Sequence, residues 1–173
     1  MIDFTTIAYL KNGNKRQQQA FEILKKYEIF EKLDAYSPVL AGTIPIEIDI
    51  EGSDLDIICE VDLQFQEAFI ETVRSFIPDN TEVHIENGAV NEEQCIVINY
   101  ALEGFLIEIF GQNKAPLQQN AYRHMITEHK ILQEKGENFK QKIIELKKEG
   151  IKTEPAFGLL LGLEDPYEEL LKF

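Results

Sequence analysis

A chain of 173 residues with 44% hydrophobic residues can bury one core without disulfides, and its composition is that of a globular protein. No apolar run approaches the roughly 20 residues of a membrane span, and the first residues lack the basic start and apolar stretch of a secretory signal. We therefore expect a cytoplasmic protein with no membrane contact, in which Cys59 and Cys95 are buried free thiols.

The net charge of −14 is unevenly distributed along the chain. Residues 33–113 include 17 acidic side chains and a single basic one, Arg74, whereas residues 114–153 include nine basic and five acidic side chains. The acidic central part would repel nucleic-acid phosphates, so DNA or RNA binding there is disfavoured. The same field would attract a metal cation, and an anion would bind through a metal or through the basic C-terminal part.

The first predicted element is an amphipathic helix over residues 14–33, where apolar residues recur at three- and four-residue spacing. Alternating apolar and acidic residues then predict a half-exposed strand over residues 44–50. Glu51-Gly52 is typical of a tight turn into a further strand over residues 54–61. We therefore expect these two strands to form a hairpin.

The remaining elements follow from the same patterns. Asp62 is the expected N-cap of a second helix that ends before Pro78. Turn-like Asn87-Gly88 and Glu103-Gly104 separate three predicted strands, at residues 82–86, 94–100 and 105–110. Beyond Pro116 the pattern becomes helical, with helices expected over residues 117–133 and 138–148 and short helical pieces over residues 154–173.

This order of elements predicts an α+β fold: a mixed, mostly antiparallel sheet of about five strands, flanking helices and a helical C-terminal third. We expect residues 1–113 to form the α/β core. Residues 114–173 would form a helical extension packed on that core, so that the whole chain makes one compact unit.

Three carboxylates carry the chemistry in this pattern. On a strand, Asp54 and Asp56 point to the same face, and their mutual repulsion is offset most simply by a divalent cation. Glu108 interrupts an apolar face of the strand at residues 105–110, where an unpaired carboxylate costs several kcal/mol. Because Arg74 is the only base in this half of the chain, a metal shared by the three acids is favoured over an ion pair.

These residues resemble the pattern of the nucleotidyltransferase (polymerase-beta-like) superfamily. The match consists of Gly42-Thr43, ten intervening residues, Asp54-Leu55-Asp56-Ile57 and a third acid, Glu108, on a later strand. A closer resemblance, to a small bacterial family of uncharacterised function within that superfamily, is carried by residues 41–59, 108–112 and 119–124.

The resemblance implies an Mg²⁺-dependent transfer of a nucleoside monophosphate from a nucleoside triphosphate (NTP) to a hydroxyl of an unidentified small molecule or protein. Asp54, Asp56 and Glu108 would hold up to two Mg²⁺ ions, and Glu108 would take the acceptor's proton. Gly42, Thr43 and Ser53 would contact the phosphates. The resemblance specifies neither the base nor an oligomeric state.

Departures from the family pattern keep an alternative open. Thr43 stands where Ser or Gly is usual, Pro45 and the following alternation suggest a strand instead of a helix, and bases to balance a triphosphate are scarce nearby. A non-catalytic nucleotidyltransferase-like binding or regulatory module is therefore the alternative. A phosphohydrolase that uses the same acids is a third, weaker possibility.

Two residues of the predicted helix at 117–133 are further candidates. Glu128 falls within its apolar stripe, so it faces either the cleft or a lysine from another helix. Arg123 would bind substrate phosphate or form a surface ion pair. His124 and His129 are five residues apart and do not form the i, i+4 pair of a helical zinc site.

Overall fold

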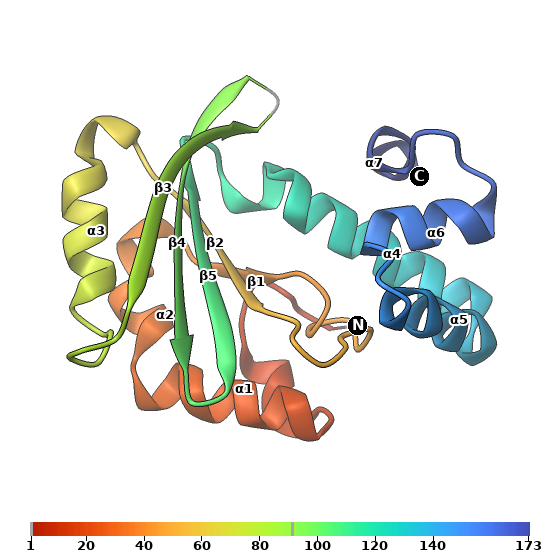
Figure 1. Ribbon diagram of the computed structural model, residues 1–173, viewed down its shortest axis with the longest axis horizontal. Coiled ribbons are helices and arrows are strands. Elements are labelled where there is room, and N and C mark those ends of the chain that lie inside the picture. The colour runs from red at the N-terminus through yellow and green to blue at the C-terminus, as the bar shows by residue number, and fades with distance from the viewer. Residues whose placement is uncertain (1, 91) are drawn as a thin grey trace.

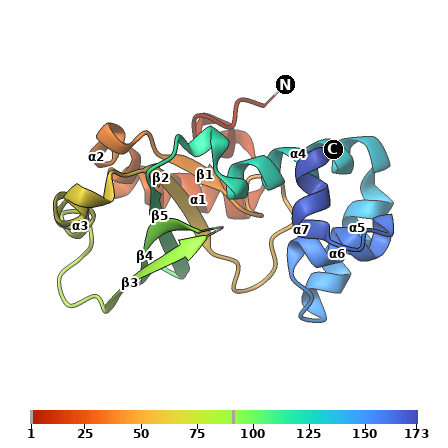
Figure 2. The same cartoon turned by 90° about the horizontal axis from the view of Figure 1, so that it is seen from above.

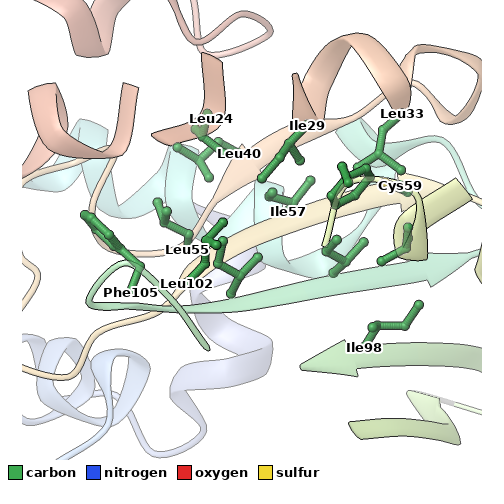
Figure 3. Close-up of a cluster of buried hydrophobic side chains, with 14 of the residues drawn as sticks. Leu24, Ile29, Leu33, Leu40, Leu55, Ile57, Cys59, Ile98, Leu102 and Phe105 are labelled. Atoms are coloured by element: carbon green, nitrogen blue, oxygen red, sulfur yellow. The ribbon is translucent and has the colours of Figure 1, made fainter. Parts of the chain in front are cut away.

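The computed structural model describes residues 2–90 and 92–173. After a short 3-10 helix, Ala8–Asn12, helix α1 (Lys15–Lys26) begins at a capping box formed by Asn14 and Gln17. The single helix predicted over residues 14–33 is wrong, because Glu28 adopts a φ of 53° and a separate short helix, α2 (Ile29–Lys32), follows. The change of direction lets Leu24 and Ile29 both reach the core between these helices and the sheet, as Figure 3 shows.

A five-stranded sheet lies at the centre of the molecule, in the order β1-β2-β5-β4-β3. Its strands are β1 (Val39–Ala41), β2 (Leu55–Glu60), β3 (Val83–Val90), β4 (Glu93–Leu102) and β5 (Phe105–Gln112). Only the β2–β5 pair is parallel, and the other three pairs are antiparallel. The predicted fold class is therefore confirmed, and β5 occupies the expected central position (Figure 1).

The hairpin expected from residues 44–61 does not form. Strand β2 pairs instead with β1, and the chain between them makes a compact turn in which Ile48 N donates to Thr43 O. Pro45 has no N–H for a strand ladder, and Glu47 takes a φ of 60°. The alternation arises because the isoleucines of this turn are buried, whereas Glu47 is exposed and Asp49 is half-buried; the three buried isoleucines are Ile44, Ile46 and Ile48.

Strand β3 is longer than its sequence pattern predicts. Asn87 and Gly88, expected to form a turn, lie inside β3 and pair with Ile96 and Cys95 of β4. The hairpin between β4 and β5 does turn at Glu103-Gly104, as predicted. Both cysteines are free and buried, also as expected.

One face of the sheet packs against α1, α2 and α3 (Gln66–Arg74), and this side holds the larger hydrophobic core (Figures 2 and 3). Asp62 caps the start of this segment, where its side chain accepts a hydrogen bond from Gln64 N. Leu55 and Ile57 of β2 and Ile107 and Ile109 of β5 point into this core. The alternate residues of the same strands, Asp56 and Glu108, therefore belong to the opposite face.

The opposite face meets the C-terminal helices, which gather at one end of the molecule in Figure 1. They are α4 (Asn120–Lys135), α5 (Glu137–Lys148), α6 (Thr153–Leu161) and α7 (Pro166–Glu169). A second cluster of buried side chains joins them to β1 and β2, with Phe157 and Ile58 among its members. Among the helices of the described residues, none combines the length and apolar character that crossing a membrane requires.

Candidate active site

The site is built around Asp56 and Glu108, which are register partners on the parallel strands β2 and β5. Register partners in neighbouring strands point to the same face, so two carboxylates lie side by side under the C-terminal helices. Asp54 precedes β2 by one residue and is half-buried. The structure thus brings the three predicted acids to one end of the β2–β5 pair.

The electrostatics of Asp56 are unusual. Burial, followed by the nearby charges of Asp54 and Glu108, raises the pKa of Asp56 to about 8. Burial and the charge of Asp54 also raise the pKa of Glu108 above its ordinary value. Lys147 of α5 is the positive group that acts in the other direction on Asp56. The site therefore holds more negative charge than its protein neighbours neutralise.

Two hollows meet at Asp56. The first is a groove of about 400 Å³ that Asp54 and Asp56 line together with hydroxyl groups and lysines. Its hydroxyls are those of Thr43, Ser53 and Thr153, and its lysines are Lys147 and Lys152. Ser53 Oγ accepts a hydrogen bond from Ile50 N, at 2.9 Å, so its proton remains free to be donated.

Lys147 is the most buried cation of this groove. Its side chain is 7% exposed, its Nζ donates to Ile48 O at 2.7 Å, and burial lowers its pKa. An ammonium has three donors, so two remain for a ligand. This lysine comes from the basic C-terminal third of the chain and supplies a positive charge that the acidic sheet region lacks.

The second hollow is a cavity of about 350 Å³ on the Glu108 side, between the sheet and α4. It shares four lining residues with the groove: Thr43, Asp56, Thr153 and Glu154. Glu128 of α4 is 3% exposed and lines this cavity, and its charge also acts on Lys147 of the neighbouring helix α5, so both sequence interpretations stay open. Burial, with a smaller contribution from Glu154, raises the pKa of Glu128 to about 8.

Two buried oxygen atoms of this cavity have no hydrogen-bond partner among the described residues, Glu128 Oε1 and Gln119 Oε1. The amide orientation of Gln119 is fixed, because its Nε2 donates to Cys59 O at 2.9 Å and to Lys114 O at 2.8 Å. A buried acceptor without a donor costs free energy, on the order of 1–3 kcal/mol. Both atoms are almost inaccessible as they stand, so a ligand donor would satisfy them after a small movement of the side chain.

His124 joins the cavity wall to α6 and α7. Its Nε2 lies 2.8 Å from Tyr167 O, and since a carbonyl only accepts, Nε2 carries the proton. Its Nδ1 lies 3.5 Å from Glu154 Oε1. His124 thus lies against Glu154, at the junction of the two hollows.

The three acids offer the oxygen ligands that Mg²⁺ prefers, and their excess negative charge fits a divalent cation. Within residues 2–90 and 92–173, however, no group of three His, Cys, Asp or Glu side chains is close enough to hold one ion. Asp54 lines only the groove and Glu108 only the cavity, while Asp56 lines both. Binding one metal with all three therefore requires side-chain rotation toward a common point.

The remaining predicted residues are placed as follows. Gly42 and Thr43 follow β1 and line the cavity beside Asp56. Arg123 is exposed, and its guanidinium lies 3.5 Å from Asn120 Oδ1 and from Leu171 O, outside the lining of both hollows. Three residues of the site have no motif in the sequence and were missed: Lys147, Lys152 and Glu154. Gln119 begins the stretch 119–124 that carried the closer resemblance, but the sequence assigned it no role. For the two lysines, the available signal was the basic balance of residues 114–153.

Three solved structures illustrate the similarity of fold. Cid1 poly(U) polymerase with Mg and 3′-dATP bound matches with a TM-score of 0.55 and 13% identity, over 78% of this chain and 41% of that chain. The polymerase core of the RNA surveillance complex TRAMP matches with a TM-score of 0.52 and 12% identity, over 82% and 43%. The GLD-2/RNP-8 complex matches with a TM-score of 0.53 and 13% identity, over 90% and 61%.

At this level of identity, the similarity shows a nucleotidyltransferase-like fold, and the chain spans about half the length of these proteins. No curated protein matches the chain in sequence. A family model described as a domain of unknown function, DUF4269, matches residues 22–173, and the chain belongs to this family.

Proposed function

We propose that this DUF4269 protein is an Mg²⁺-dependent nucleotidyltransferase that moves a nucleoside monophosphate from an NTP to a hydroxyl of a small molecule or a protein. The observation that carries the proposal is the position of Asp56. Of the three predicted acids, it is the one that lines both a lysine-containing groove and a carboxylate-rich cavity, on a fold similar to nucleotidyltransferases. A donor nucleotide and an acceptor could therefore meet at this one residue.

The groove has the chemistry of a triphosphate site. Lys147 and Lys152 supply positive charge, and the hydroxyls of Thr43, Ser53 and Thr153 can donate to phosphate oxygens. These lysines come from the C-terminal third, so the shortage of bases seen in the sheet region is made up by the helices. The groove thereby supports the sequence prediction for Thr43 and Ser53 as phosphate contacts.

Glu108 lies on the other side of Asp56 and lines the cavity. Its raised pKa suits a general base that takes the proton of the acceptor hydroxyl. In the transfer, the acceptor oxygen forms a bond to the α-phosphorus and the bond to the β-phosphate breaks, releasing pyrophosphate. Mg²⁺ held by Asp54, Asp56 and Glu108 would supply charge neutralisation for the triphosphate and a lower pKa for the acceptor hydroxyl.

The acceptor is best described by the charge of its surroundings. The cavity lining includes five acids, which are Asp56, Glu93, Glu108, Glu128 and Glu154. Its lysine, Lys114, is held in an ion pair with Glu93, at 2.6 Å. A polynucleotide acceptor would bring its phosphates against these acids, so a small molecule or a protein fits better.

A non-catalytic binding or regulatory module is the second candidate. It is favoured by the separation of the acids, because no three metal-ligating side chains converge within the described part of the chain. In this reading the groove still binds a nucleotide, but no transfer follows. An in-cell comparison of wild type with Asp54→Ala distinguishes the two, since unchanged function of the variant would favour the module.

The direct test is calorimetry with a non-hydrolysable ATP or GTP analogue, with and without Mg²⁺. Wild type should bind the nucleotide in an Mg²⁺-dependent way, and Asp54→Asn/Asp56→Asn should weaken binding by about 100-fold or more, because the metal loses two charged ligands. Asp79→Asn, an exposed acid outside both hollows, is the matched control. A wild-type protein that binds neither metal nor nucleotide would exclude the enzyme.

Turnover is measured separately as pyrophosphate release from the parent NTP. Release of inorganic phosphate in place of pyrophosphate would instead identify a phosphohydrolase using the same acids.

A further inference from the structure

We propose that the cavity on the Glu108 side binds the acceptor through an amino group, and that Glu128 receives the resulting ammonium. The acceptor would then be an amine-bearing alcohol of small size. The role of this ligand as the acceptor rests on the proposed function. The amine-binding cavity itself can be tested without nucleotide, metal or turnover.

The first observation is the pair of buried oxygen atoms without a donor. Glu128 is 3% exposed and Gln119 is 2% exposed, both line the cavity, and the Oε1 atom of each lacks a hydrogen-bond partner among the described residues. Turning the Gln119 amide would not help its own oxygen, because two backbone carbonyls already accept from its Nε2. An ammonium at Glu128 would supply the donor that this carboxylate lacks, and Gln119, at the N-cap of the same helix, would need a separate donor.

The second observation is the sign of the charge around these atoms. Glu154 is close enough to Glu128 to raise its pKa further, while Lys147 acts in the opposite direction. Lys147 already donates to Ile48 O and lines the groove, not the cavity. Lys114 is the one lysine or arginine among the residues that line the cavity, and it is ion-paired to Glu93, so a cationic ligand would remove the cost of ionising Glu128.

The third observation concerns size and the remaining walls. A volume of about 350 Å³ suits a ligand about as large as a monosaccharide. Ile58, Phe110 and Met125 provide apolar surface for a carbon framework, while Glu108 lies in the same cavity for the hydroxyl that reacts. An amine held by Glu128 would therefore place a hydroxyl of the same molecule on the side of Glu108 and Asp56.

The test uses matched pairs of probes that differ only in an amine: glucosamine against glucose, and 1,3-diaminopropan-2-ol against glycerol. Binding to the full chain is measured by calorimetry and by ligand-observed NMR near neutral pH, without nucleotide or metal. The amine member of at least one pair should bind about tenfold or more tightly than its neutral partner, as expected for a charged hydrogen bond in a buried site. Equal binding within both pairs, or no binding by either amine, would overturn the proposal.

Variants test whether Glu128 causes the preference for the amine. Glu128→Gln keeps the shape but removes the charge, and it should abolish the preference for the amine. Glu134→Gln, an exposed acid on the same helix, should retain it. Glu128→Asp keeps the charge at a greater distance and should give an intermediate preference, which guards against a folding defect in the first variant. A preference that survives in Glu128→Gln would refute the assignment.

Asp54→Asn separates this inference from the proposed function, because Asp54 lines the groove and not the cavity. That variant should lose Mg²⁺-dependent nucleotide binding and keep amine binding. Amine binding without any nucleotide binding in wild type would disprove the transferase while leaving the cavity assignment intact. Nucleotide binding whose base preference depends on Glu128, without amine binding, would assign the cavity to the nucleobase instead.

Discussion

A Cβ atom placed on Gly42 would lie 1.9 Å from Asp56 Oδ2, so the backbone after β1 rests directly against the central carboxylate. Gly42 also has a φ of 79°, in the left-handed region that glycine tolerates. The glycine of the motif is thus needed twice at this position, for the turn itself and for the space that Asp56 occupies.

The first prediction concerns Gly42→Ala. The added methyl group should displace the Asp56 carboxylate and weaken Mg²⁺-dependent nucleotide binding by about tenfold or more, with a stability loss of about 1–2 kcal/mol from the backbone strain. Calorimetry and thermal unfolding measure the two effects. Gly104→Ala is the control, because Gly104 has a φ of 83° and nothing within 4 Å of its Cβ position. Equal nucleotide binding by both variants would contradict the role assigned to Gly42.

The second prediction is a pH dependence of stability caused by Asp56. Its pKa is about 8 in the folded protein against 3.8 for the ordinary group, so the unfolded chain releases this proton at a lower pH than the folded one. The free energy of unfolding should therefore fall as the pH rises from about 4 to 8. An asparagine does not ionise, so the free energy of unfolding of Asp56→Asn should not fall in this way. Without metal, this variant should be more stable than wild type at pH 8 by about 2–4 kcal/mol.

Thermal unfolding between about pH 5 and pH 8 checks the Asp56 prediction, with Asp79→Asn as the exposed control. The advantage of Asp56→Asn should shrink toward pH 5. Added Mg²⁺ should raise the melting temperature of wild type more than that of the variant, because the ion neutralises a charge that only wild type carries. A constant difference across the pH range would mean that Asp56 titrates normally.

The third prediction assigns Lys147 to the triphosphate. Lys147→Met keeps much of the buried volume but removes the ammonium, so nucleotide affinity should fall by about 10- to 100-fold. Ile48 O loses its donor, which should cost on the order of 1–3 kcal/mol of stability. Lys148→Met, its exposed neighbour, controls for the loss of net charge. Amine binding in the cavity should not weaken in Lys147→Met, because the lysine lines only the groove.

The fourth prediction identifies Gln17 as the residue that fixes the turn after Gly42. Its Nε2 donates to Ile44 O at 3.0 Å and to Pro45 O at 3.1 Å, while its Oε1 accepts from Asn14 N. Gln17→Ala should destabilise the protein by about 1–3 kcal/mol, because two buried carbonyls lose their donor. Hydrogen exchange should show faster opening at residues 43–48 in this variant, and Gln19→Ala, which alters an exposed side chain, should leave both measurements unchanged.

Several features followed from the sequence because they depend on neighbours in the chain. Alternation along a strand placed Asp54 and Asp56 on the face opposite Leu55 and Ile57. The structure confirms that the side chains of Leu55 and Ile57 enter the core. The apolar run around Glu108 indicated a central strand, which β5 is. Helical periodicity likewise put Glu128 on an inward stripe, where it lines the cavity.

Alternation was misleading at residues 44–50, because burial in a compact turn produces the same pattern as a half-exposed strand. The missing discriminator was a side chain far away in sequence, Gln17, which satisfies the carbonyls of that turn. The turn predicted at residues 87–88 was wrong for a related reason, since pairing with β4 overrides the local preference of Asn-Gly for a turn.

The sequence by itself determined the fold class, the three carboxylates and the glycine that accommodates them, since strand periodicity and residue chemistry are local properties. Only the tertiary structure decided what surrounds the acids. Packing of the C-terminal helices places Lys147 in the groove and leaves Glu128 Oε1 without a hydrogen-bond partner among the described residues. Lys147 and Glu128 lie 91 and 72 positions after Asp56, where no spacing in the chain records which side chains will meet.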